Sequence, residues 1–386
     1  MRVAEPTPDT PYLALDVPFA VRRLRRLQAA LPTTGIHYAV KANPDPALLT
    51  ALARAGSRFD VASPAEVRGC LAAGAAPEHL VYSNPVKRRD DIAWAAAQGV
   101  RLFVVDSPEE TEKVAGAAPG SAVLCRILTT GVGSDWPLSR KYGVVPAHAP
   151  DLLRTAAGLG LDAAGVSFHV GSQQRDPRAW DQPIAEAARI FADLRAGGLR
   201  PRLLDLGGGL PAALEGGAPP LMAYAAQIER SLRRHFGTDR PETILEPGRS
   251  VVADAGTLVT RVVLVLWRGN TRWVYLDAGV FSGLVETLDE AIRYRLDTTA
   301  TGPTGPCVLA GPTCDSADVL YEKAPVRLPL SIAEGDLVRL RAAGAYTTCY
   351  TTSFNGFDPL ATVFTGARTA DAAHTGPGAD LRELAS

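Results

Sequence analysis

From residue 36 onward the chain repeats one pattern, in which a short apolar run precedes an amphipathic, alanine-rich segment with helical spacing. Alternating strands and helices of this kind form a parallel sheet with right-handed crossovers. Eight such runs are present, the number that closes a (β/α)8 TIM-like barrel. The pattern predicts an α/β barrel, with a doubly wound open sheet as the competing arrangement. The expected strands are 36–40, 58–62, 80–82, 101–105, 122–127, 163–168, 203–206 and 243–246.

After about residue 250 the alternation stops, and β-rich runs separated by Gly and Pro turns take over. We therefore predict a barrel domain over residues 30–250 and an all-β C-terminal domain over residues 251–365. A short apolar run at 11–16 is a further strand candidate. Residues 366–386 are rich in Ala, Gly, Thr and Pro, and we expect them to form a flexible tail.

The composition argues against several classes of protein. With a net charge of −1, the chain has no overall field that would favour nucleic acid or an anionic membrane. No apolar run approaches the roughly 20 residues that span a bilayer. The five cysteines are scattered without a CxxC pair, so we expect reduced thiols and no metal site. The opening segment lacks the apolar core of a secretory signal, and we expect a cytoplasmic location.

The segment YAVKAN at 38–43 ends an apolar run abruptly at Lys41. A lysine at the end of a buried strand is costly unless its charge is removed or paired. One chemical use of such a lysine is a Schiff base, for which desolvation lowers the pKa of the amine. From this segment alone, a strand-end lysine that points into solvent is the more common outcome.

Chemically able residues also follow the other expected strands, where barrels of this kind carry their active sites. Three glycines at 207–209 follow the seventh strand, and Glu246 and Arg249 follow the eighth. Glycine amides and an arginine at these two loops suit a phosphate. Together with a strand-end lysine they suggest pyridoxal phosphate, with Glu246 as the partner of its ring nitrogen. The remaining strand ends carry Asp60, Arg126 and His169, and Ser172 lies just beyond.

At this point the sequence resembles the alanine-racemase-like (fold type III) pyridoxal-phosphate-dependent decarboxylases of basic amino acids. The resemblance covers most of the chain, and its motifs stand in the family's order. It implies that the strand at 11–16 packs with the β domain. The motifs are YAVKAN at 38–43, FDVAS at 59–63, SFHVGSQ at 167–173, LDLGGGLP at 204–211, EPGRSVVADAG at 246–256, GPTCDSAD at 311–318 and GAYTTCYTTSFNGF at 344–357.

The resemblance assigns roles around the cofactor. Lys41 would hold pyridoxal phosphate, with Asp60 beside it. Arg126 would lie near the ring oxygen, His169 would stack on the ring, and Glu246 would pair with the ring nitrogen. The implied phosphate ligands are Ser172, Gly207, Gly208, Gly209, Gly248, Arg249 and Tyr346.

The resemblance also implies a head-to-tail homodimer in which each active site uses both subunits. Cys314 resembles the thiol that reaches the active site from the second subunit and returns a proton to Cα after CO2 has left. Asp315 resembles the carboxylate that grips the distal ammonium group of the substrate. The segment 283–292 resembles the same region of bacterial ornithine-type enzymes. Its candidates for the rim of the substrate pocket are Glu286, Asp289 and Glu290, of which at least one is expected to be solvated.

The expected reaction is decarboxylation of L-ornithine to putrescine and CO2, as in polyamine biosynthesis. The pair Cys314-Asp315 favours an ornithine-type enzyme, because diaminopimelate decarboxylases usually carry Cys-Glu there. Phe281 stands where many ornithine enzymes have Tyr, so lysine, diaminopimelate or a modified diamino acid stays open. A regulatory homologue without activity would be expected to lose Lys41, the glycines or the cysteine. A racemase would often carry Arg in place of Glu246.

Overall fold

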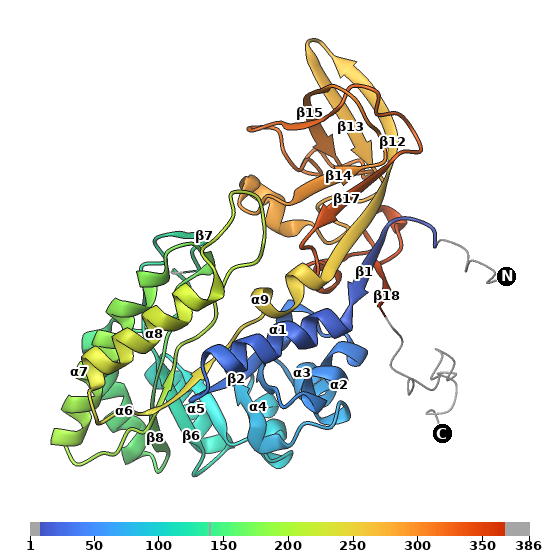
Figure 1. Ribbon diagram of the computed structural model, residues 1–386. Helices are drawn as coiled ribbons and strands as arrows, with labels where there is room; N and C mark the ends of the chain where they lie inside the picture. Colours follow the sequence, from blue (N-terminus) through green and yellow to red (C-terminus); the bar gives the residue numbers. More distant parts are fainter. Residues whose placement is uncertain (1–7, 139, 367–386) are drawn as a thin grey trace, which may run out of the picture.

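The computed structural model describes residues 8–138 and 140–366, so the expected tail at 366–386 lies outside the described residues except for Gly366. The described chain forms a closed barrel and a separate β-sheet domain (Figure 1). Within these two ranges, no helix has the length and apolar character needed to cross a bilayer.

Eight parallel strands close the barrel, as the sequence predicts, and the open sheet is therefore wrong. Going around the barrel, β2 is followed by β3, β4, β5, β6, β8, β10 and β11, and β11 pairs again with β2. The strands are β2 (Thr34–Ala39), β3 (Arg58–Val61), β4 (Leu80–Tyr82), β5 (Leu102–Val105), β6 (Ala122–Arg126), β8 (Asp162–Ser167), β10 (Leu203–Asp205) and β11 (Glu242–Leu245).

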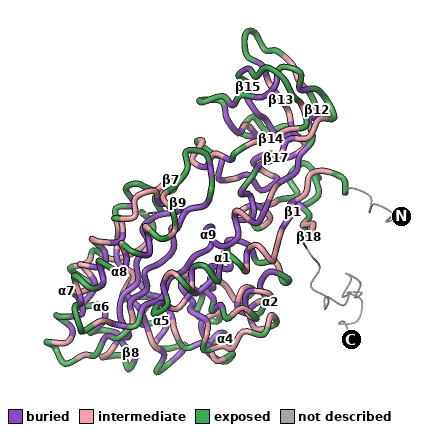
Figure 2. The backbone as a smooth tube through the Cα atoms, in the orientation of Figure 1, coloured by how far each residue is buried: buried purple, intermediate pink, exposed green. Residues whose placement is uncertain are grey.

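A small apolar cluster fills the inside of the barrel. It takes one buried residue from each of five strands and is separate from the main core, as expected where side chains alternate between the barrel interior and the surrounding helices. Figure 2 shows the barrel strands as buried and the outer helices as partly exposed. The interior residues are Val81, Val104, Leu124, Ala164 and Ile244.

Several barrel helices begin at a side-chain cap followed by proline. Asp45, Ser63 and Ser107 each accept backbone N–H groups of the first turn, and each precedes a proline whose fixed φ suits that position. The helices are α1 (Val17–Ala30), α2 (Pro46–Arg54), α3 (Pro64–Ala72), α4 (Arg89–Ala97), α5 (Pro108–Ala117), α6 (Ala149–Gly158), α7 (Asp181–Ala196) and α8 (Leu221–Phe236).

The second domain is built on one sheet with the order β14-β17-β12-β13-β15-β16. The N-terminal strand β1 (Tyr12–Asp16) pairs antiparallel with β12 and parallel with β18, so the first strand of the chain joins the second domain. The other strands are β12 (Gly256–Arg268), β13 (Thr271–Leu276), β14 (Arg295–Thr298), β15 (Thr304–Ala310), β16 (Val326–Pro329), β17 (Leu337–Arg341) and β18 (Ala361–Thr365).

Two details differ from the sequence prediction. The β-rich region expected after about residue 250 begins only at Gly256, because α9 (Arg249–Val252) and a 3-10 turn (Ala253–Ala255) come first. The first barrel strand ends at Ala39, and Val40–Ala42 form a 3-10 turn. Val40–Ala42 follow a strand, and Arg249–Ala255 precede one. Both helical segments contain valine, a β-branched residue that favours strands, so the sequence pattern predicts a strand there.

Candidate active site

The 3-10 turn after β2 carries Lys41 to the carboxyl end of the barrel. Val40 and Ala42 are buried on either side, whereas the Lys41 side chain is 43% exposed. Two backbone bonds fix the turn: Tyr346 donates its N–H to the carbonyl of Ala42 (2.8 Å), and Ala39 donates to the carbonyl of Pro247 (3.2 Å). The reactive end of Lys41 is thus open to a ligand while its backbone is held by segments far away in the sequence.

Asp60 on β3 is the immediate partner of Lys41. Nζ of Lys41 donates to Oδ2 of Asp60, and the hydroxyl of Ser83 donates to Oδ1. Burial lowers the pKa of Lys41, but the negative charges of Asp60 and Glu246 raise it more, so the net direction is upward. The lowered pKa that desolvation alone predicts for Lys41 is therefore wrong.

Glu246 follows β11 at the carboxyl end of the barrel. The residue is 7% exposed, and its buried Oε1 has no hydrogen-bond donor among the described residues. Burial and the neighbouring carboxylate of Asp205 raise its pKa well above the ordinary value. Asp205 itself is held by the Ser167 hydroxyl (2.9 Å) and the Gly207 N–H (2.9 Å). A buried carboxyl oxygen without a donor is the expected partner for a protonated ring nitrogen.

His169 follows β8, and its ring is fixed by the backbone. Its Nδ1 accepts the N–H of Gly171 (3.0 Å), which places the proton of the neutral ring on Nε2. Burial, Arg126 and Lys41 lower the pKa of His169 to about 3, so the ring is neutral at physiological pH. A neutral imidazole can lie flat against a bound aromatic ring without adding charge.

The middle glycine after β10 allows three parts of the site to meet. A Cβ added at Gly208 would lie 2.7 Å from the carbonyl oxygen of Glu246 and 3.0 Å from Nε2 of His169. These distances are shorter than carbon normally tolerates, so a larger residue would push the loop away. The neighbours Gly207 and Gly209 have φ values of +63° and +110°, a region that favours glycine.

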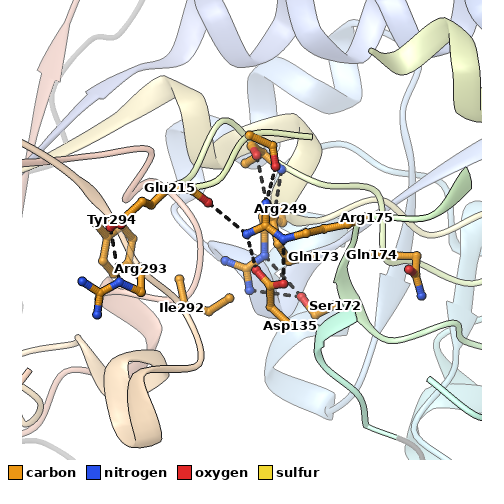
Figure 3. Close-up of polar contacts among 12 residues, drawn as sticks. Asp135, Ser172, Gln173, Gln174, Arg175, Glu215, Arg249, Ile292, Arg293 and Tyr294 are labelled. Carbon is orange, nitrogen blue, oxygen red and sulfur yellow. Dashed lines mark hydrogen bonds and ion pairs between the residues drawn. The ribbon is translucent and has the colours of Figure 1, made fainter. Parts of the chain in front are cut away.

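Arg249 and Ser172 form a donor-rich corner of the site (Figure 3). Nε and Nη2 of Arg249 lie 3.2 and 3.1 Å from Oγ of Ser172. Nη1 is buried and has no acceptor among the described residues. The guanidinium lies 4.8 Å from the centre of the Tyr346 ring, and a Cβ at Gly248 would come within 3.1 Å of the Tyr346 hydroxyl. This corner therefore fits a phosphate group.

Arg126 at the end of β6 is half-buried and lies 5.5 Å from the centre of the Tyr142 ring. Across the mouth, Arg175 donates from Nε and Nη2 to the carboxylate of Asp135 (2.7 and 2.6 Å) and from Nη2 to the carbonyl of Glu215 (3.0 Å), as Figure 3 shows. The loops that border the site are thus tied to each other.

The structure does not bring Cys314 and Asp315 to Lys41 of the same chain. Both lie exposed in the segment between β15 and β16. Cys314 donates its N–H to Oδ1 of Asn355 (3.0 Å), and Oδ1 of Asp315 accepts the N–H of Ala317 (2.9 Å). Among the described residues, no hydrogen bond or ion pair joins either side chain to the barrel mouth. Their expected action in a second subunit stays a prediction.

The expected substrate residues lie on the β-domain side of the site. Phe281 packs against Phe354, with ring centres 4.6 Å apart. Glu290 accepts from Arg293 at Oε2 (2.8 Å) and from the N–H of Ala324 at Oε1 (3.2 Å), so both its oxygens are engaged. Asp289 is exposed and pairs with Lys323 (3.0 Å), which makes it the solvated member of the expected rim.

Two residues of the site were missed or misplaced by the sequence prediction. No role is predicted for Asp205, the neighbour of Glu246, although its place two residues before Gly207 is a visible signal. Glu286 was placed at the rim of the substrate pocket, but its carboxylate bonds Arg249 (2.6 Å). No local pattern indicates that contact, because 37 residues separate the pair.

Comparisons with known proteins find one matching family and several similar chains. The family described as "Pyridoxal-dependent decarboxylase, pyridoxal binding domain" matches residues 20–253. The lysine/ornithine decarboxylase of Selenomonas ruminantium is 35% identical over 353 residues, covering 90% of this chain and 88% of that protein. The lysine/ornithine decarboxylase of Vibrio vulnificus, solved in complex with cadaverine, has a TM-score of 0.84 at 32% identity and covers 93% of this chain and 95% of its own. Antizyme inhibitor 2 of Xenopus laevis is 32% identical, covering 90% of this chain and 79% of its own.

Proposed function

Because this chain belongs to the pyridoxal-dependent decarboxylases, we propose that it decarboxylates a basic L-amino acid, specifically L-ornithine to putrescine and CO2. Family membership confirms the expected fold class and the expected cofactor, pyridoxal phosphate. One observation supports the activity most: an open lysine lies at the same end of the barrel as a buried carboxyl oxygen and a buried guanidinium nitrogen, neither of which has a hydrogen-bond partner in the described part of the chain. These three groups match the aldehyde, ring nitrogen and phosphate of the cofactor.

Each residue of the mouth has a definite task in this proposal. Pyridoxal phosphate, when bound, supplies an electron sink for the electrons left on Cα when CO2 departs. Lys41 would hold the cofactor, and Asp60, already bonded to Nζ, would hold the proton that the amine releases. Glu246 would keep the ring nitrogen protonated, and neutral His169 would hold the ring in place. Arg249 and Ser172, with the glycine amides and Tyr346, would bind the phosphate.

We further propose a homodimer in which Cys314 and Asp315 act in the partner's site. Both side chains are exposed in the single chain, and Asn355, which bonds Cys314, lies among exposed aromatic residues. An exposed apolar patch beside charged and reactive groups is typical of an interface. The aromatic residues are Tyr350 (44% exposed), Phe354 (38%) and Phe357 (42%).

The choice between ornithine and lysine rests on one methylene group. A difference of that size in a pocket is worth only about 1–3 kcal/mol, or roughly 10- to 200-fold in kcat/KM. We therefore expect both substrates to be turned over, with ornithine preferred and arginine and diaminopimelate poor. Measuring kcat/KM for these four amino acids tests the assignment. A preference for diaminopimelate, or equal values for lysine and ornithine, would contradict it.

The alternative function is that of a regulatory protein without enzymatic activity. We consider it because one relative is named as an antizyme inhibitor. Lys41, the three glycines, Glu246 and Cys314 are all present in this chain, whereas a protein that only binds a partner has no need of them. Their presence supports the enzyme.

A further inference from the structure

A buried ion pair joins the β domain to the cofactor corner. Glu286 belongs to the 3-10 segment Val285–Glu290, which follows β13, and its Oε1 accepts a hydrogen bond from Nη2 of Arg249 at 2.6 Å. Arg249 is 3% exposed and Glu286 is 6% exposed. Two charges taken out of water are costly, and here Oε2 of Glu286, like Nη1 of Arg249, has no hydrogen-bond partner among the described residues.

The donors of Arg249 are unevenly used. Arginine has five N–H groups in a rigid planar fork. Nε and Nη2 are occupied by Ser172 and Glu286, whereas Nη1 is buried and has no acceptor among the described residues. Because the fork is rigid, a partner that fixes Nη2 also fixes the direction of Nη1.

We propose that Glu286 is a positioning residue that orients the Arg249 guanidinium, so that Nη1 is presented to the phosphate of the cofactor. This deepens the proposed function and rests only on its cofactor. Ser172 offers one hydroxyl oxygen to both Nε and Nη2, so it supplies a single fixed point. The carboxylate at the outer edge of the fork supplies a second fixed point, and it comes from a different domain.

The Glu286 carboxylate also repels a phosphate dianion, and this repulsion opposes the gain in cofactor affinity that comes from orienting Arg249. Arg249 lies between the two anions in this proposal and interacts with Glu286 directly at 2.6 Å. A charge-assisted hydrogen bond is about twice as strong as a neutral one and fixes geometry as well. We therefore expect the orienting effect to exceed the repulsion.

The test compares two ligands that differ only in the phosphate. Affinities of the apoprotein for pyridoxal phosphate and for pyridoxal are measured by visible absorbance in the parent, Glu286→Ala and Glu286→Gln. In Glu286→Ala, we expect pyridoxal phosphate to bind at least about 10-fold more weakly, as losing a charged hydrogen bond implies. Pyridoxal should change less than twofold. Glu286→Gln keeps an acceptor and the same length, so it should recover most of the affinity.

The matched control is Asp289→Asn, which removes a carboxylate from the same segment where the side chain is exposed and pairs with Lys323. It should leave both affinities unchanged. Three results would overturn the proposal: unchanged affinity of Glu286→Ala for pyridoxal phosphate, equal losses for the two ligands, or tighter binding in either Glu286 variant. Equal losses would show a pair that merely docks the domains.

These readouts are independent of turnover. A parent protein that binds pyridoxal phosphate but releases no CO2 would contradict the proposed function and leave this inference intact. A parent that decarboxylates ornithine while Glu286→Ala binds the cofactor normally would contradict this inference alone.

Discussion

Nζ of Lys41 and Oδ2 of Asp60 form an ion pair in which the carboxylate is completely buried and the lysine is partly exposed. Asp60 cannot move to another partner without losing Ser83 as well, so it stays fixed when the lysine turns away. The pair raises the pKa of Lys41. We infer that Asp60 keeps the lysine at the barrel mouth as a cation and takes over its proton when the amine reacts.

Lys87 is the alternative candidate for the lysine that holds the cofactor, which we assign to Lys41. It also lies near the carboxyl ends of the strands, and burial lowers its pKa to about 8, so pKa alone would favour it as the reactive amine. However, its Nζ is buried against the carbonyl of Val104 (2.7 Å) and Glu110 (3.0 Å). Borohydride reduction of the protein with pyridoxal phosphate, followed by peptide mapping, should place the label on Lys41. Label on Lys87 would show that the open position matters less than the pKa.

Cys314 is expected to set the product of the reaction rather than its first step. In Cys314→Ala, CO2 release should continue, but protonation at Cα should fail and turnover should divert to decarboxylation-coupled transamination, lowering the ratio of amine to CO2. The control is Cys349→Ala, which removes the other exposed thiol of the β domain, 3.9 Å from the carbonyl of Ala42. If Cys314→Ala released amine and CO2 in equal amounts, Cys314 would not be the proton donor. If the ratio of amine to CO2 fell in Cys349→Ala, Cys349 would be the donor instead.

A mixing experiment tests whether active sites are shared. Lys41→Ala and Asp315→Ala should each be nearly inactive on ornithine. After subunit exchange, hybrid dimers would contain one site with both parent residues, so about a quarter of the parent activity should return. If Lys41 and Asp315 acted within one chain, every site in the mixture would lack one of them and no activity would return.

His37 on β2 predicts how stability depends on pH. The residue is 3% exposed, and burial followed by the charge of Arg58 lowers its pKa to about 3. His37 therefore binds a proton near pH 6.5 in the unfolded chain but stays neutral in the folded chain. The free energy of unfolding falls as pH drops from 6.5 towards 3. Between pH 7 and pH 5 this amounts to about 2 kcal/mol.

His37→Leu should reduce the loss of unfolding free energy between pH 7 and pH 5 by about that amount, measured by urea denaturation at both pH values. Exposed His148 provides the control, and His148→Leu should keep the parent's pH dependence. An unchanged slope in His37→Leu would mean that His37 is protonated in the folded protein.

The barrel, and the residues that we expect beside Lys41 at its strand ends, could be predicted because each follows from a local sequence pattern. Strand-helix alternation gives eight strands, and Gly207 to Gly209, Glu246 and Arg249 stand at strand ends that any barrel brings together. The direction of the Lys41 pKa was not open to prediction, because it depends on how close Asp60 and Glu246 lie in space. The contact between Glu286 and Arg249 crosses two domains, so periodicity along the chain carries no trace of it.

The most direct measurement is the release of CO2 and amine from L-ornithine by the purified protein supplied with pyridoxal phosphate, with Lys41→Ala measured in parallel. The account predicts equal amounts of CO2 and putrescine from the parent protein and neither from Lys41→Ala. An absence of CO2 from ornithine, lysine, arginine and diaminopimelate alike, in protein that shows the absorbance of the bound cofactor, would contradict it.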